Sequence, residues 1–166
     1  RLPCSCEPVK RSCSAEFRAP GEAVHKAILS MRAISRPVAR ISGSVRAPGD
    51  KSCSHRAVMM AAVASGVSTI TGLLEGEDVL NTAKAVKALG AGVERTGQGA
   101  WRIEGVGAKG FSTPSGDLDF GNSGTGARLM MGLVGGHEVT ARFVGDASLS
   151  SRPMERVLKP LREMGV

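Results

Sequence analysis

The chain has 166 residues, of which 42% are hydrophobic and only 3% aromatic, so it is long enough for one globular domain whose core is built from aliphatic side chains. The net charge of +7 is concentrated in residues 1–40, which carry eight Lys and Arg residues against three Glu, and the rest of the chain has neither the excess charge nor the aromatic residues of a nucleic-acid-binding surface. No apolar run approaches the roughly 20 residues of a membrane span, so we expect neither nucleic acid nor a membrane as a partner.

Residues 1–40 form the first predicted region, a basic leader without clear periodicity. Two interpretations stay open: a transit-like peptide over residues 1–30, which would direct the protein to a plastid, or a translation start at Met31, which we favour and which fits a cytoplasmic protein. The cysteines at positions 4, 6 and 13 lie in this leader, and Cys53 stands alone. We expect Cys53 to be a small buried residue and not a nucleophile. With no metal-ligand or disulfide spacing, we expect no metal. Separately, we expect no cofactor.

Regular structure is predicted from Ile41 onward. Residues 41–45 alternate like a short strand, and the turn at 47–50 leads into an almost wholly apolar helix that Ser52 or Ser54 can cap and that ends at 65–66. Such a helix is expected to be buried. The following stretch, 67–73, is rich in β-branched residues and predicts a strand.

A second helix is expected after residue 78, with Asp78 as its cap and Gly90 as its end. Glu75 and Glu77, just before it, are expected to lie in a solvated turn. Its apolar positions have helical spacing: Val79, Ala83, Val86 and Leu89. Residues 93–96 and 101–106 then predict a hairpin around Gly97-Gln98-Gly99.

The same order recurs downstream: a loop at 121–125, an apolar helix at 128–134, a strand at 139–144 and a helix at 153–164 that has Pro in its first turn. Arg56 aligns with Arg128, and the segment beginning at Val86 aligns with the one beginning at Leu161. Two such units predict that the apolar helices pack together inside and that the sheets face outward. Because the second unit lacks a closing hairpin, we expect the native chain to continue.

Both apolar helices start at loops of small and polar residues, an arrangement that presents backbone N–H groups and the helix dipole to an anion. Lys51, Ser52 and Arg56 belong to the first loop, and the second holds Asn122 and Thr125. A third helix start, near residue 153, brings Arg152. The residues alone leave two interpretations open, since such groups are also ordinary caps, turns and solvated charges.

Four segments resemble one family: GSVRAPGDKSCSHR (43–56), ITGLLEGEDVLNT (70–82), LDFGNSGTGARLMMGLVG (118–135) and GDASLSSRPMERVLKPLREMGV (145–166). They resemble the 3-phosphoshikimate 1-carboxyvinyltransferases (EPSP synthases), most closely the bacterial glyphosate-tolerant type. The resemblance implies an α/β (α+β) fold, the enolpyruvyl transferase-like inverse α/β prism of repeated strand and helix units with inward helices. Residues 41–166 would be a partial N-terminal domain of about two units.

The resemblance also implies a reaction, the transfer of an enolpyruvyl group from phosphoenolpyruvate to the 5-hydroxyl of shikimate 3-phosphate. By family position, Lys51 contacts both substrates and is the one catalytic candidate, while Ser52 and Arg56 hold shikimate 3-phosphate. Gly124 borders the phosphoenolpyruvate pocket, Arg152 holds that substrate's anionic groups, and Asn122 and Thr125 support the loop. The family takes its acidic groups from a second domain, so we expect this chain alone to be inactive. The resemblance also implies that the full-length protein is a monomer.

One position departs from the glyphosate-tolerant type, which carries Ala where this chain has Gly124. We therefore expect glyphosate to inhibit the full-length enzyme. Two alternatives to the main reading remain. The related UDP-N-acetylglucosamine enolpyruvyl transferase uses a loop Cys that the corresponding loop here, 145–153, lacks, and a non-catalytic anion-binding module is the other alternative.

Overall fold

The computed structural model of the chain describes residue 40 and residues 42–166. The leader predicted for 1–40, with Met31 and three of the four cysteines, therefore lies outside the described residues except for Arg40, and Ile41 lies outside them as well. Residues 44–166 cluster as one unit. Its elements are α1 (Lys51–Val63), β1 (Ser65–Thr71), α2 (Glu77–Ala88), β2 (Gly92–Gly97), β3 (Ala100–Val106), the 3-10 turn η1 (Gly107–Lys109), β4 (Leu118–Asp119), α3 (Gly124–Val134), β5 (Phe143–Val144), α4 (Ala147–Ser150) and α5 (Glu155–Glu163).

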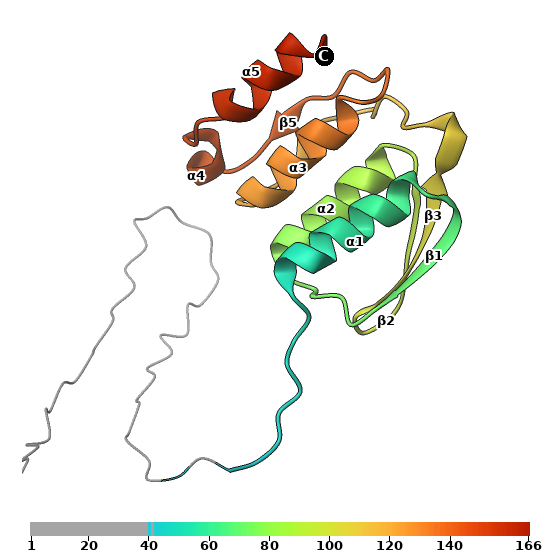
Figure 1. The fold of residues 1–166 in the computed structure, drawn as a ribbon, viewed down its shortest axis with the longest axis vertical. Coiled ribbons are helices and arrows are strands. Elements are labelled where there is room, and N and C mark those ends of the chain that lie inside the picture. The colour runs from blue at the N-terminus through green and yellow to red at the C-terminus, as the bar shows by residue number, and fades with distance from the viewer. Residues whose placement is uncertain (1–39, 41) are drawn as a thin grey trace, which may run out of the picture. The chain divides into compact units, whose positions relative to one another are not determined.

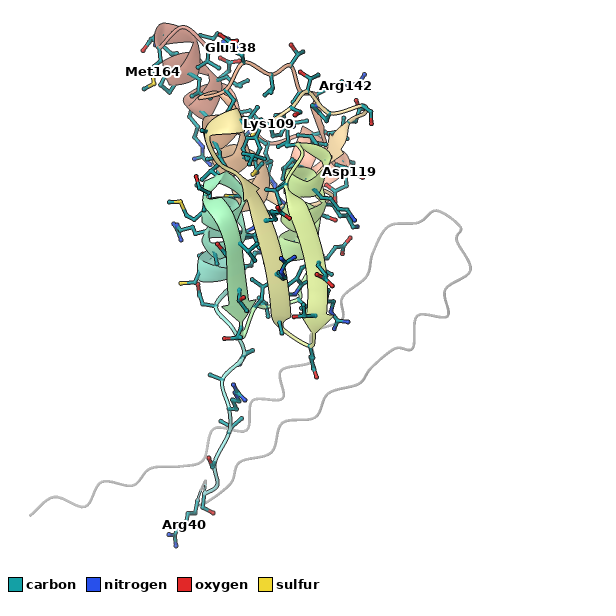
Figure 2. All side chains as sticks on the ribbon, turned by 90° about the vertical axis from the view of Figure 1, so that its right-hand side faces the viewer. Arg40, Lys109, Asp119, Glu138, Arg142 and Met164 are labelled. Carbon is teal, nitrogen blue, oxygen red and sulfur yellow. The ribbon has the colours of Figure 1, made fainter. Side chains whose placement is uncertain are left out.

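The first half of this unit is a three-stranded antiparallel sheet with two helices on one face. The strand order is β1-β3-β2, and β2 and β3 form the predicted hairpin. Helices α1 and α2 cover the same face, which Figure 2 shows by placing the strands in front of the helices. Along β3, Trp101 and Ile103 are buried under the helices while Arg102 and Glu104 are exposed on the other face. The prediction that this sheet faces outward is confirmed.

The second half repeats the order helix, strand, helix as α3, β5 and α5, with β4 before α3 and the short α4 before α5. Strands β4 and β5 pair in parallel, α3 packs against α1 and α2, and α5 packs on α3 as α2 packs on α1 (Figure 1). The internal repeat and the contact between the two apolar helices, α1 and α3, follow the prediction. The strand expected at 139–144 is shorter, because only Phe143 and Val144 pair with a neighbour.

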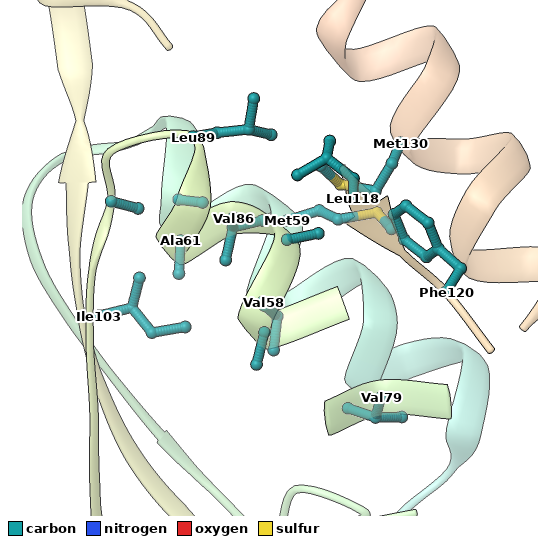
Figure 3. Packing of buried hydrophobic residues seen from close by; sticks show 14 of the residues in the cluster. Val58, Met59, Ala61, Val79, Val86, Leu89, Ile103, Leu118, Phe120 and Met130 are labelled. Atoms are coloured by element: carbon teal, nitrogen blue, oxygen red, sulfur yellow. The ribbon is translucent and has the colours of Figure 1, made fainter. Parts of the chain in front are cut away.

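The core lies between the helices and under the sheet (Figure 3). All four apolar positions predicted for α2 are buried. Around them pack Val58, Ile103, Leu118, Phe120 and Met130, none more than 1% exposed. The composition of α1 suggested a helix buried on all sides, but the structure buries only part of it. Met59 lies in the core, whereas the next side chain, Met60, is 65% exposed.

The strand predicted at 41–45 is wrong for its described part. No strand forms over 42–50, and Val45 is 92% exposed. A strand needs a neighbour for its backbone groups, and none of the described strands pairs with this segment. The alternating pattern therefore predicted a strand that has no pairing partner among the described strands.

Four predicted helix starts also differ. Helix α3 begins at Gly124 instead of 128. Asp50, rather than Ser52 or Ser54, caps α1, and its carboxylate accepts the Cys53 amide at 2.7 Å. Gly76 precedes α2, so Asp78 lies inside the first turn, where its charge suits the helix dipole. Helix α5 starts at Glu155 instead of 153.

Glu75 ties the loop before α2 to the hairpin, although the sequence suggested only a solvated turn. Its carboxylate accepts hydrogen bonds from Arg95 Nε at 2.7 Å and Nη2 at 2.8 Å, from Trp101 Nε1 at 2.9 Å and from the Gly99 amide at 3.1 Å. These bonds, those from Arg95 first, lower the pKa of Glu75 from 4.5 to about 2. The charged carboxylate is thus the form that stabilises the fold.

We expect Glu75→Gln to flatten the acid dependence of stability. In the wild type, the contribution of Glu75 is complete above pH 4.5, the pKa of the unfolded chain, and is lost as the pH falls towards about 2, where the folded carboxylate is protonated. Urea unfolding at steps between pH 2 and 6 measures this slope. The control is Glu94→Gln, because Glu94 is 65% exposed and lies 3.9 Å from Arg102. Equal slopes in wild type and Glu75→Gln would contradict the assignment.

Candidate functional site

The N-termini of three helices lie at one end of the unit formed by residues 44–166. Helices α1, α2 and α3 run side by side in the same direction (Figure 1). Lys51, the first residue of α1, forms an ion pair with Asp78 in the first turn of α2. Gly121, in the loop before α3, lies against Asn81 of α2, whose Nδ2 would be 3.0 Å from a Cβ at Gly121. This end therefore collects the positive ends of three helix dipoles.

A buried hydrogen bond fixes these helix ends relative to one another. His55 of α1 is fully buried, and its Nδ1 lies 2.8 Å from Thr82 Oγ1 of α2. Ser123 caps α3 by accepting the Gly126 amide at 3.2 Å. A Cβ at Gly126 would lie 2.7 Å from Ser123 Oγ, 2.9 Å from Thr82 Oγ1 and 3.3 Å from His55 Cε1. The three helix starts are thus packed too closely to shift independently.

The protonation state of His55 follows from this geometry. The Thr82 hydroxyl donates to the Asp78 carbonyl at 3.3 Å, so it accepts from His55 Nδ1, which carries the proton of a neutral ring. Burial lowers the pKa of His55 below its usual 6.5. His55 is therefore a neutral spacer between helices and is no cation for a ligand.

Arg152, which follows α4 in the chain, contacts the loop before α3. Its Nη2 donates to Asn122 Oδ1, and also to Ser148 Oγ of α4 at 3.2 Å. The two loops are joined by the backbone as well, since the Asp146 amide donates to the Gly121 carbonyl at 2.9 Å. Helix α4, which the sequence did not predict, thus positions Arg152 at the Asn122 loop.

Gly124 lies beneath two guanidinium groups. The residue is buried, and a Cβ at this position would be 2.6 Å from Arg152 Nη1 and 3.2 Å from Arg128 Nη1. Because side chains on a helix point towards its N-terminus, Arg128 reaches back one turn to Gly124. The sequence interpretation did not include Arg128 among the site residues, although its position four residues after Gly124 was the signal for this contact.

The other predicted site residues lie on the same helix starts but make fewer contacts. Lys51 is 52% exposed beside Asp78. Ser52, Arg56 and Thr125 are exposed in or next to the first turns of α1 and α3. Within residues 40 and 42–166, no hydrogen bond or ion pair joins the side chains of Ser52, Arg56 and Thr125 to Arg152 or Asn122. The structure therefore brings Arg152, Asn122 and Gly124 together, and the ligand roles of all seven residues stay predictions.

Other kinds of site find no support in the part of the chain that the structure describes. There, no group of His, Cys, Asp or Glu side chains is suited to hold a metal ion. None of the described helices has the length and hydropathy to cross a membrane. Cys53, interpreted from the sequence as a small buried residue, is exposed, and the carboxylate of Asp50 raises the pKa of its thiol, which disfavours a thiolate nucleophile.

Comparison with known proteins gives one consistent family. The family described as EPSP synthase (3-phosphoshikimate 1-carboxyvinyltransferase) matches residues 35–166. The chain is 61% identical over 132 residues to the 3-phosphoshikimate 1-carboxyvinyltransferase of Hyphomonas neptunium, covering 80% of this chain and 30% of that protein. It is 65% identical over 125 residues to the protein of the same name from Afipia carboxidovorans, covering 75% of this chain and 28% of the relative.

A solved structure, EPSP synthase from Acinetobacter baumannii, resembles this one with a TM-score of 0.71 and 47% identity. The similarity covers 75% of this chain and 28% of that one. The enolpyruvyl transferase-like α/β fold expected from the sequence is thereby confirmed. The chain spans less than a third of the length of the relatives that it matches.

Proposed function

The chain belongs to the EPSP synthase (3-phosphoshikimate 1-carboxyvinyltransferase) family, and we propose that its protein transfers the enolpyruvyl group of phosphoenolpyruvate to the 5-hydroxyl of shikimate 3-phosphate. The observation that best supports this proposal is the position of Arg152, which Asn122 holds at the N-terminus of α3 beside Gly124. A guanidinium at a helix N-terminus suits a carboxylate or a phosphate. The UDP-N-acetylglucosamine enzyme and the non-catalytic module are not favoured by the named relatives.

The proposed reaction makes large electrostatic demands on the site. A proton adds to the methylene carbon of phosphoenolpyruvate, the 5-hydroxyl oxygen bonds to the adjacent carbon and loses its proton, and a tetrahedral intermediate forms. Loss of inorganic phosphate and of one proton from the new methyl group then gives the enol ether. In this scheme Arg152 holds the anionic groups of phosphoenolpyruvate, while Lys51, Ser52 and Arg56 hold shikimate 3-phosphate. Positioning two anions side by side requires this positive end of the fold.

We also propose that residues 41–166 form about two repeated units of the N-terminal domain. Supporting this, α1 with α2 and α3 with α5 are two similar helix pairs, and the relatives are more than three times as long as the matched segment. The monomeric state and the cytoplasmic location expected from the sequence stay predictions.

The activity is tested in the full-length protein with shikimate 3-phosphate and phosphoenolpyruvate. We expect release of one phosphate per enol ether formed, and binding of both substrates by calorimetry. UDP-N-acetylglucosamine serves as the alternative acceptor. Turnover with that acceptor instead would favour the related transferase, and binding without any turnover would favour the non-catalytic module.

Replacing Gly124 with Ala is expected to make the full-length enzyme less sensitive to glyphosate. A methyl group at this position would be 2.6 Å from Arg152 Nη1 and would narrow the pocket. Because the atoms in its way belong to the side chains of Arg152 and Arg128 and not to the backbone, the fold should be retained. Inhibition curves at fixed phosphoenolpyruvate measure the effect. Equal sensitivity of the wild type and Gly124→Ala to glyphosate would show that a methyl group at this position does not hinder the inhibitor.

A further inference from the structure

Arg128 has an environment that the contacts within the described chain do not explain. Its Nε is buried without a hydrogen-bond partner, and its side chain is half-buried. Among residues 40 and 42–166, no carboxylate forms an ion pair with it. Leaving a buried donor of a charged group unsatisfied is costly, so the guanidinium lacks an acceptor that something else must supply.

The neighbourhood of Arg128 makes its charge more unfavourable still. Its Nη1 and that of Arg152 both lie within 3.2 Å of one point, the Cβ position that Gly124 leaves empty. The two guanidiniums therefore repel each other at short range. Arg128 also lies in the second turn of α3 and reaches back to the positive end of the helix dipole, where a cation is disfavoured.

Arg152 does not relieve this repulsion through its own partners. Its two hydrogen-bond acceptors, Asn122 Oδ1 and Ser148 Oγ, are neutral, and no described carboxylate pairs with it. The two adjacent guanidiniums have no anionic partner among the described residues, so their charge is available to an oxyanion. The missing side chain at Gly124 leaves space for that oxyanion at the helix N-terminus.

We propose that Arg128 is a further anion-binding residue, which forms with Arg152 a two-arginine clamp over Gly124 for one multiply charged oxyanion. The inference rests on the proposed function for the identity of the anion, phosphoenolpyruvate, whose phosphate and carboxylate supply the charge. The clamp itself requires only the oxyanion class. Inorganic phosphate therefore tests the clamp independently of turnover.

The test compares Arg128→Gln with the matched control Arg142→Gln in the full-length protein. Arg142 is 78% exposed and its Nη2 lies 3.6 Å from Asp117, so the control removes the same charge from the surface. We expect the dissociation constants for inorganic phosphate and for phosphoenolpyruvate to rise about 10- to 100-fold in Arg128→Gln. The control should change them less than twofold, and binding of shikimate 3-phosphate should be unchanged in both.

Stability without ligand gives the second readout, because the two explanations predict opposite signs. If Arg128 repels Arg152 until an anion binds, the unliganded Arg128→Gln protein melts at the same temperature as wild type or higher, and phosphate raises that temperature less. A lower melting temperature with unchanged anion binding would assign Arg128 to a carboxylate elsewhere in the protein and overturn the proposal. Arg128→Lys, which keeps the charge but loses the planar fork, should bind with intermediate affinity, and wild-type affinity in it would also count against the clamp.

Loss of turnover and loss of the clamp are distinguishable. Phosphate binding that depends on Arg128 in a protein that does not convert the two substrates would refute the proposed function and retain the clamp. If the protein converts both substrates but its affinities for phosphate and phosphoenolpyruvate do not depend on Arg128, the proposed function is retained and the clamp is refuted.

Discussion

Arg152→Lys is expected to lower kcat/KM for phosphoenolpyruvate by about 100-fold in the full-length enzyme. The Arg152 guanidinium is held in one orientation by Asn122 Oδ1 and Ser148 Oγ, which leaves Nη1 directed at Gly124. A lysine keeps the charge but cannot bond to Asn122 and Ser148 while also presenting a planar pair of donors to an anion. The loss of a charge-assisted pair of hydrogen bonds, about 3 kcal/mol, corresponds to roughly that factor.

Steady-state kinetics with each substrate varied in turn measure this effect. The KM for shikimate 3-phosphate should change far less, since Lys51, Ser52 and Arg56 are the residues proposed to hold that substrate. Arg142→Lys is the matched control, being the same change at a side chain that is 78% exposed. A kcat/KM in Arg152→Lys within threefold of the control would contradict the role assigned to Arg152.

The parts of the fold that the sequence predicted well are those held by local signals. Helix α2 combines a helical apolar spacing with Gly90, whose φ of 104° is the left-handed conformation that ends a helix easily. The hairpin has Gly99, with a φ of 63°, between two strands. In these segments a few neighbouring residues determine the backbone, so the order and type of the elements could be read before any tertiary contact was known.

The failures lie where a distant partner decides. Residues 42–45 alternate as a strand does, yet no described strand pairs with them. Ser54 looks like a cap, but its hydroxyl instead accepts the amide of Leu74, 20 residues away, at 3.0 Å. Glu75 seemed a solvated acid until the hairpin brought Arg95 and Trp101 to it. None of these contacts has a signature in sequence spacing.

The candidate site divides in the same way. Asn122, Gly124 and Arg152 were predicted from loop composition and family resemblance, and the structure brings them together. Arg128 was missed despite its position four residues after Gly124, because an arginine on an apolar helix is normally solvated at the surface. Its significance depends on the approach of Arg152, which follows 24 residues later in the chain and is positioned by the short helix α4.

Gly126→Ala and Gly132→Ala are expected to have opposite effects on stability, although both add one methyl group to α3. In a helix the change from Gly to Ala normally stabilises by about 0.5–1 kcal/mol. Gly132 is exposed and a Cβ there would meet no atom within 4 Å, so this gain should be realised. At Gly126 the methyl group would be 2.7 Å from Ser123 Oγ and 2.9 Å from Thr82 Oγ1, both in fully buried residues.

The Ser123 and Thr82 side chains cannot move aside at Gly126 without breaking the cap of α3 or the hydrogen bond between His55 and Thr82. We therefore expect Gly126→Ala to destabilise the protein by about 1–3 kcal/mol. The same displacement would move the Asn122 loop away from Arg152, and phosphoenolpyruvate affinity should fall together with stability. Urea unfolding of the two variants beside wild type measures the first effect, and calorimetry the second. A Gly126→Ala protein as stable as Gly132→Ala would mean that the three helix starts are not packed as rigidly as these distances require. This packing would then not be what holds the Asn122 loop at Arg152.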